Sequence, residues 1–369
     1  MYEDRFSDFY AQPILPPETG GEDPEVVRQN RENETSDLKK LLRILAISVF
    51  ATLVMKEFLD NVVWSIFYSI KFDYLYLHVI DFDFFSQSVN GGAKVYTMDT
   101  FYTLGWLFSD IIVYTPGLVV FSIAFKKYKN FRHSPALVDF PSWGIPVFFV
   151  AMNSMSWIGI RLSRFIAEIA DMLFGTGELR DVFADSMPDN QIQYLTAYLV
   201  IGITGPIIEE IIYRHLLLRP LRRFGDWHAV IITAVMFGAF HGNATQFLYT
   251  TIAGIFMGMV AVKANSVKPA IVIHIINNCF SVAGDHLYDL AYEGKIPITP
   301  RGVSDFYNFM NYGGLMVAIL LLINHHFVLS NKNPHLTTKE RAKMTLSNPW
   351  ILVMAAVLTY TVWQGSLRS

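Results

Sequence analysis

Long apolar segments follow one another along this chain of 369 residues and restrict the structures that it can adopt. A helix needs about 20 apolar residues to cross the hydrocarbon core of a membrane. The sequence therefore predicts an all-α, polytopic transmembrane helical bundle. By that criterion there are about nine candidate spans, at 41–59, 101–125, 142–162, 194–218, 227–243, 246–264, 269–285, 311–330 and 349–365.

Two further segments combine apolar residues with charges and are predicted to lie at the membrane interface. Lys71 and Asp73 interrupt the apolar segment 62–80. The segment 161–173 repeats apolar residues at helical spacing between charges, which is typical of an amphipathic interfacial helix. The spans at 227–243, 246–264 and 269–285 are short and joined by tight turns, so we expect them to form a compact antiparallel group.

Composition and charge exclude several classes of protein. Charged residues make up 17% of the chain, against about 25% in soluble domains, and the net charge is -3. The basic residues form short clusters between apolar segments rather than one patch, so the chain lacks the broad basic surface that binds nucleic acid. The single cysteine, Cys279, excludes an intrachain disulfide and a multi-cysteine metal site, which leaves His, Asp, Glu and Asn as candidate ligands.

The first 38 residues have the composition of a solvated acidic tail. They hold ten Asp or Glu against three Lys or Arg and contain no apolar stretch of the kind found in a secretory signal. We expect residues 1–38 to be a disordered cytoplasmic tail, 39–193 to form N-terminal transmembrane helices and interfacial segments, 194–285 to form a catalytic core, and 286–369 to form C-terminal transmembrane helices.

The distribution of basic residues predicts the orientation in the membrane. One set of alternate loops holds sixteen Lys and Arg, whereas the opposite set is longer and holds eight. Because short cytoplasmic loops carry the excess of positive charge, the N-terminus is predicted to be cytoplasmic and the C-terminus external. The short loops and the lack of an organelle signal favour a bacterial plasma membrane over the endoplasmic reticulum.

Ionisable residues inside predicted spans indicate a functional site, because each costs about 2.5 to 3.5 kcal/mol to insert. The first group lies in the segment 205–214, where Pro206 is predicted to restart a broken helix. Glu210 and Arg214 are four residues apart and are predicted to form an ion pair on one face. Glu209 points about 100° away from Glu210, which leaves it free for chemistry.

Two more polar groups lie on the neighbouring short spans. Phe237 is one turn before His241, and His274 is one turn before Asn278, so each pair shares a helix face. A carboxylate that acts as a general base, two imidazoles and an amide that donates to an oxyanion are the parts of a hydrolase that activates water. The sequence contains no G-x-S-x-G elbow, no H-E-x-x-H helix and no P-loop.

These residues, in this order, resemble the CPBP intramembrane endopeptidases, which comprise the type II CAAX prenyl proteases and the bacteriocin-processing or self-immunity proteins. The resemblance covers about residues 195–285. It implies that Glu209 and His241 activate a water and that His274 and Asn278 stabilise the oxyanion. The remaining motif positions, Glu210, Arg214 and Phe237, have supporting roles.

The resemblance also implies a cofactor and partners. The family name implies a metal, so Zn²⁺ bound by Glu209, His241 and His274 is one expectation, while two histidines and a glutamate also activate water without one. The expected partners are a membrane-associated peptide or protein substrate and the lipid bilayer. Two alternatives stay open: a catalytically idle immunity or scaffold protein, and an ion-coupled transporter, because a broken helix with intramembrane carboxylates also describes a transport site.

Overall fold

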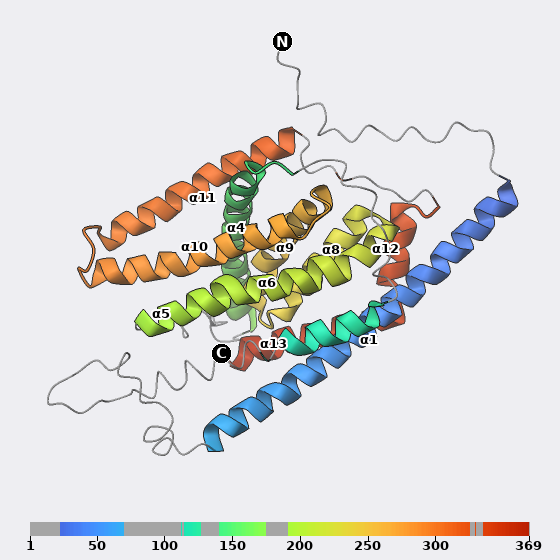
Figure 1. Ribbon diagram of the computed structural model, residues 1–369, viewed down its shortest axis with the longest axis horizontal. Coiled ribbons are helices and arrows are strands. Elements are labelled where there is room, and N and C mark those ends of the chain that lie inside the picture. Colours follow the sequence, from blue (N-terminus) through green and yellow to red (C-terminus); the bar gives the residue numbers. More distant parts are fainter. Residues whose placement is uncertain are drawn as a thin grey trace, which may run out of the picture.

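The computed structural model describes residues 23–69, 112, 114–126, 140–174, 191–324, 329 and 335–368. Within these residues every regular element is a helix, which confirms the all-α class (Figure 1). The elements are α1 (Pro24–Ser69), an unlabelled helix (Tyr114–Ala124), α4 (Gly144–Phe174), α5 (Gln191–Ala197), η5 (Tyr198–Thr204), α6 (Gly205–Glu210), η6 (Ile211–Leu217), α7 (Leu218–Leu221), η7 (Arg222–Phe224), α8 (Asp226–Phe240), α9 (Ala244–Lys263), α10 (Lys268–Tyr292), α11 (Pro300–Ile323), α12 (Thr338–Leu346) and α13 (Pro349–Arg368).

The chain is a multi-pass membrane protein. Four helices in the described part are long and apolar enough to cross a membrane: Gly144–Ile169, Gln193–Phe224, Ala244–Lys263 and Pro300–Ile323. The pair α12 and α13, bent by 64°, adds a fifth if it counts as one span. Each of the predicted spans coincides wholly or in part with a helix, although residues 101–111 of the second lie outside the described residues.

The two segments predicted to be interfacial continue longer helices. Residues 161–173 belong to α4, which runs without a break to Phe174, because no proline or glycine between Arg161 and Phe174 ends the helix. Residues 62–69 are the last turns of α1, and residues 70–80 lie outside the described residues.

Residues 1–38 are predicted to form a disordered tail, but helix α1 already begins within this segment. It starts at Pro24, so residues 24–38 are helical, and residues 1–22 lie outside the described residues. The physical reason is tertiary contact: Leu38 is fully buried, Arg31 forms an ion pair with Glu340 of α12, and Asp37 forms one with Arg223. A composition that would be disordered in isolation is ordered by these partners.

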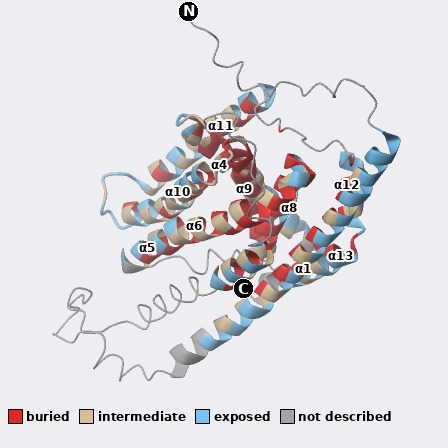
Figure 2. Ribbon diagram, turned by 45° about the vertical axis from the view of Figure 1, so that its right-hand side comes forward, coloured by how far each residue is buried: buried red, intermediate tan, exposed pale blue. Residues whose placement is uncertain are grey.

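The buried core lies where α4, α8 and α9 cross, whereas much of α1 and α13 is exposed (Figure 2). Glycines permit the close approach of α8 and α9: a Cβ on Gly254 would lie 3.0 Å from the Cα of Ala234. The turns that join α8, α9 and α10 are tight, as predicted, with a positive φ of 76° at Gly242 and 45° at Asn265. Helices α8, α9 and α10 are therefore held in one group.

The predicted orientation is testable with single cysteines in a Cys279→Ser background. Lys295 lies in the exposed turn after α10, and Lys343 lies on the exposed side of α12. We expect a membrane-impermeant maleimide added to sealed right-side-out vesicles to label Lys295→Cys and not Lys343→Cys, because the basic loops are cytoplasmic. Labelling of Lys343→Cys alone would reverse the topology.

Candidate functional site

The two adjacent glutamates lie on α6, a short α-helical segment between two π-helical segments, η5 and η6. The sequence predicts a broken helix at Pro206, and this prediction is wrong: the chain stays helical from Gln193 to Phe224. The wider π turn accommodates the proline, because the N–H of Gly205 bonds to the carbonyl of Val200, five residues back. Such π segments are frequent at functional sites.

In a π-helical pattern the N–H of residue 206 would donate to the carbonyl of Ile201, five residues earlier. Proline has no N–H, so the side chain of Asn278 supplies the donor instead. The Asn278 Nδ2 donates to the Ile201 oxygen at 2.9 Å, and Asn277 Nδ2 donates to Asn278 Oδ1 at 3.2 Å. Helix α10 comes this close because residue 202 is glycine: a Cβ there would lie 2.8 Å from the Cys279 sulfur. Asn278 is thereby tied to the segment that carries the glutamates.

Glu210 is the centre of a buried charge network. Its Oε2 accepts a hydrogen bond from Arg214 Nε at 3.1 Å, which confirms the predicted ion pair, and its Oε1 lies 3.1 Å from His274 Nδ1. Since a carboxylate only accepts, the Nδ1–H of His274 donates to Glu210. The Arg214 guanidinium lies over the ring of Phe237, 5.4 Å from its centroid, and its Nη1 and Nη2 have no hydrogen-bond partner among the described residues.

Glu209 lies beside this network, buried with 6% of its surface exposed, and in the described part of the chain Arg214 forms its ion pair with Glu210 and none with Glu209, as predicted. Its Oε1 accepts a hydrogen bond from the hydroxyl of Tyr114 at 2.5 Å, and its Oε2 lies 3.6 Å from His274 Nε2. Tyr114 is not among the residues that the sequence pattern indicates. The only signal was a hydroxyl in an apolar segment, and nothing local connects it to a residue 95 positions later.

His241 ends helix α8 and is oriented by Phe237. Its Nδ1 lies 2.8 Å from the Phe237 carbonyl, so the Nδ1–H donates there and the Nε2 lone pair is directed elsewhere. The Phe237 ring meets the ring of His241 edge-on at 4.8 Å and that of His274 at 5.7 Å. His241 interacts electrostatically with both Glu209 and His274.

The structure therefore brings together motif residues from α6, η6, α8 and α10, and Asn278 is joined through Ile201 to the helical segment that carries the glutamates. Glu209, Glu210, Arg214 and His274 are each at least 94% buried. The Phe237 ring contacts both histidine rings and the Arg214 guanidinium, and Asn278 lies one turn from His274 on the same helix. A buried carboxylate beside two oriented imidazoles and an amide can take a proton from water and hold a developing oxyanion.

The donor types of Glu209, His241 and His274 match those of a catalytic zinc site, but their arrangement does not make one. Among the described residues, no group of three or more His, Cys, Asp or Glu side chains is placed so that it could hold a metal ion. Zn²⁺ at these residues therefore stays a prediction.

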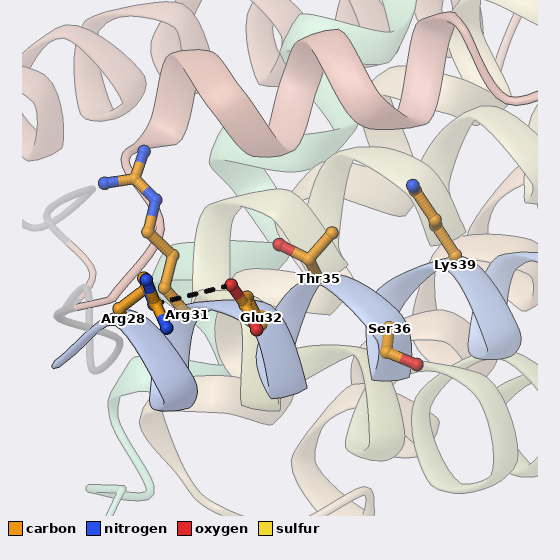
Figure 3. A pocket seen from close by; sticks show the side chains of 6 residues that line it. All are labelled: Arg28, Arg31, Glu32, Thr35, Ser36 and Lys39. Carbon is orange, nitrogen blue, oxygen red and sulfur yellow. Dashed lines mark ion pairs between the residues drawn. The ribbon is translucent and has the colours of Figure 1, made fainter. Parts of the chain in front are cut away.

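A surface hollow of about 500 Å³ lies away from these residues, on the N-terminal half of α1 (Figure 3). Its lining is Arg28, Arg31, Glu32, Thr35, Ser36 and Lys39. The two arginines already have carboxylate partners, Glu25 and Glu32 for Arg28 and Glu340 for Arg31. This hollow contains none of the motif residues, so the chemistry places the candidate active site at the buried cluster instead.

Comparison with known proteins finds a match that covers the same part of the chain. Residues 191–280 match the family model described as type II CAAX prenyl endopeptidase Rce1-like, so the predicted resemblance is confirmed over this segment. YdiL of Bacillus subtilis (strain 168), named as a proposed membrane peptidase, is 26% identical over 142 residues, which are 38% of this chain and 54% of that protein. The chain thus spans about half the length of this curated relative. No solved structure matches the chain.

Proposed function

We propose that this protein is an intramembrane endopeptidase that hydrolyses a peptide bond of a membrane-associated substrate with activated water. The observation that supports it most is the position of Glu209: a buried carboxylate next to His274, within electrostatic reach of His241, with Arg214 held away by Glu210. The family match over residues 191–280 includes every one of these positions and supports the same activity.

In this mechanism Glu209 is the general base. A water between Glu209 and His241 gives a proton to the Glu209 carboxylate, while the Nε2 of His241 accepts the second hydrogen bond of that water and orients it. The resulting hydroxide attacks the carbonyl carbon of the scissile bond. Glu209 then passes the proton to the leaving amine, and Tyr114 keeps the carboxylate in place throughout by its hydrogen bond.

His274 and Asn278 stabilise the negative charge that develops on the carbonyl oxygen. In this mechanism His274 acts with both ring nitrogens protonated: its Nδ1–H donates to the Glu210 carboxylate, which orients the ring, and its Nε2–H donates to the oxyanion. The Asn278 amide has two N–H groups. One donates to the Ile201 carbonyl, and the other is the second donor to the oxyanion.

The proposed function is tested with purified protein in liposomes that also hold lipid-anchored peptides of the CAAX and leader-peptide types. We expect mass spectrometry to show two products that result from hydrolysis of one internal bond. A protein that leaves both peptide classes intact but moves ions across the bilayer would contradict the proposal and favour the transporter. Absence of both activities would favour an immunity or scaffold role. The bacterial plasma membrane is part of the proposal, checked by fractionation of the native cells.

The proposed role of Asn278 predicts a large effect on turnover. Loss of one oxyanion donor typically lowers kcat by about 100- to 1,000-fold, so we expect that loss for Asn278→Ala with little change in KM. Asn277→Ala is the matched control, because Asn277 only holds the Asn278 side chain. It should be impaired far less. Steady-state kinetics on both variants decide the matter, and an Asn278→Ala enzyme within a few fold of the wild type would remove this residue from the mechanism.

The zinc prediction is tested separately. Because the proposed steps use the side chains of Glu209, His241, His274 and Asn278 alone, we expect the purified protein to keep its activity after dialysis against a chelator. If dialysis abolished the activity and zinc alone restored it, the result would show instead that Glu209, His241 and His274 move together around a metal.

A further inference from the structure

One face of α1 lines two hollows of opposite chemical character. The polar hollow of Figure 3 is followed along the helix by an apolar groove of about 270 Å³ between α1 and α13. Arg28 of the hollow lies 18 residues before Ala46 of the groove, and Thr35 lies 18 residues before Leu53. Because 18 residues make five turns of an α-helix, the hollow and the groove share one face of α1.

The groove is apolar along its whole length. Helices α1 and α13 pack side by side, and every side chain that lines the groove between them is aliphatic or aromatic (Figure 1). Phe50 of α1 and Val353 of α13 are 57% and 59% exposed, so the groove opens outward in the described part of the chain. From Trp350 to Val357 it extends about 10 Å along α13. Such an exposed apolar surface on a membrane protein faces the hydrocarbon chains of lipids.

Two cations lie on the same face of α1, just before the groove. Arg43 is one turn before Ala46, and Lys39 is one turn before Arg43. Both side chains are exposed, and among the described residues neither forms an ion pair or a hydrogen bond. No Asp or Glu lies three or four residues from either position in the sequence. Since like charges four residues apart on a helix repel each other, an anion bound between them is favourable.

The position of the two cations relative to the membrane narrows the chemistry of that anion. The predicted span starts at residue 41, so Lys39 and Arg43 lie at the membrane surface and the groove continues into the hydrocarbon. Trp350, in the first turn of α13, has the position typical of an aromatic residue at the interface. Basic sites between transmembrane helices on the cytoplasmic side bind anionic lipid headgroups, and the predicted orientation places this surface in the cytoplasm.

We propose that an anionic phospholipid of the bilayer binds here, with its phosphate on Arg43 and Lys39 and one acyl chain in the groove between α1 and α13. A guanidinium and an ammonium both form charge-assisted hydrogen bonds to phosphate oxygens. None of the motif residues of the candidate active site lines the groove, and neither does Tyr114. The lipid is therefore a separate ligand that joins two helices distant in the sequence, and its binding does not depend on the proposed function.

The test is native mass spectrometry of the purified full chain in detergent with equal amounts of phosphatidylglycerol and phosphatidylcholine that carry the same acyl chains. We expect bound phosphatidylglycerol to exceed bound phosphatidylcholine by at least about tenfold, because two cations favour the anionic headgroup. Glycerol 3-phosphate at the same concentration should not displace the lipid, since it has no chain for the groove. Displacement by this headgroup alone would show a phosphate site and would overturn the inference.

Charge variants locate the headgroup. Arg43→Gln and Lys39→Gln should each lower the preference for phosphatidylglycerol about fivefold, and Arg43→Lys should keep it. Lys268→Gln is the matched control, because Lys268 is an exposed lysine at the start of α10, at the same predicted surface and outside the groove. A preference that Arg43→Gln and Lys39→Gln leave unchanged, or that Lys268→Gln lowers equally, would overturn the inference.

A groove variant locates the acyl chain. Val353→Trp fills the groove from its exposed side and keeps both cations, so bound phosphatidylglycerol should fall to the level of phosphatidylcholine. Leu352→Trp is its control, because Leu352 is an equally exposed neighbour on α13 that does not line the groove. Full binding by Val353→Trp would contradict the inference. So would a wild-type dimer that carries no lipid, since a second copy of the chain would then cover the groove.

Discussion

Glu209→Gln is expected to abolish measurable peptide hydrolysis and to leave the fold intact. General-base catalysis contributes about 100- to 10,000-fold, and an amide cannot take the proton from water. The substitution keeps the size of the side chain, and its amide oxygen can still accept the hydrogen bond from Tyr114. No charge is left without its partner, since Arg214 pairs with Glu210 rather than with Glu209.

The measurement is kcat on a lipid-anchored peptide, together with thermal unfolding in detergent. Glu293→Gln is a suitable control, because Glu293 lies exposed in the turn after α10 and pairs only with nearby Lys295. If Glu209→Gln kept full activity while a folded Glu210→Gln lost it, the roles of the two glutamates would be reversed.

Glu210→Gln is expected to lower both stability and activity. Removal of one partner from a buried ion pair costs about 3 to 5 kcal/mol, because the other charge stays buried without compensation. The side chains of Glu210 and Arg214 are both 0% exposed, and two nitrogens of the guanidinium already lack a hydrogen-bond partner in the part of the chain that the structure describes. Activity should fall as well, since His274 loses the carboxylate that orients its ring.

A double variant separates the two effects. We expect Glu210→Gln with Arg214→Met to be less destabilised than the sum of the single variants, because the pair is removed together, and to remain inactive because His274 still lacks its acceptor. The control is Asp305→Asn, which breaks an exposed pair of the same i,i+4 spacing with Arg301 and should leave the unfolding temperature unchanged. Similar unfolding temperatures for Glu210→Gln and Asp305→Asn would show that the buried network does not contribute to stability.

Much of the fold could be predicted from the sequence because a membrane imposes a length and a polarity on every helix. The apolar segments predict the helices for this reason, and a tight turn at Gly242 follows from the same local rules. The predictions that failed concern how far a helix continues. Whether α1 includes residues 24–38 depends on Glu340 and Arg223, which are distant in the sequence.

The prediction of a helix break at Pro206 was wrong for a related reason. A proline removes one donor, and local rules then favour a break. The structure keeps the helix by a π turn, and the carbonyl that Pro206 leaves unpaired accepts from Asn278, 77 residues from Ile201. No local pattern contains that donor.

The sequence by itself determined the pairs that one helix turn brings together: Glu210 with Arg214 and Phe237 with His241. These follow from the repeat of a helix alone. Only the tertiary structure decided which residues of different helices meet, such as Tyr114 with Glu209 and Glu210 with His274. The reason is physical: spacing along a helix sets which residues share a face, but packing of the helices sets which faces are opposed, and the charge network exists only where those faces meet.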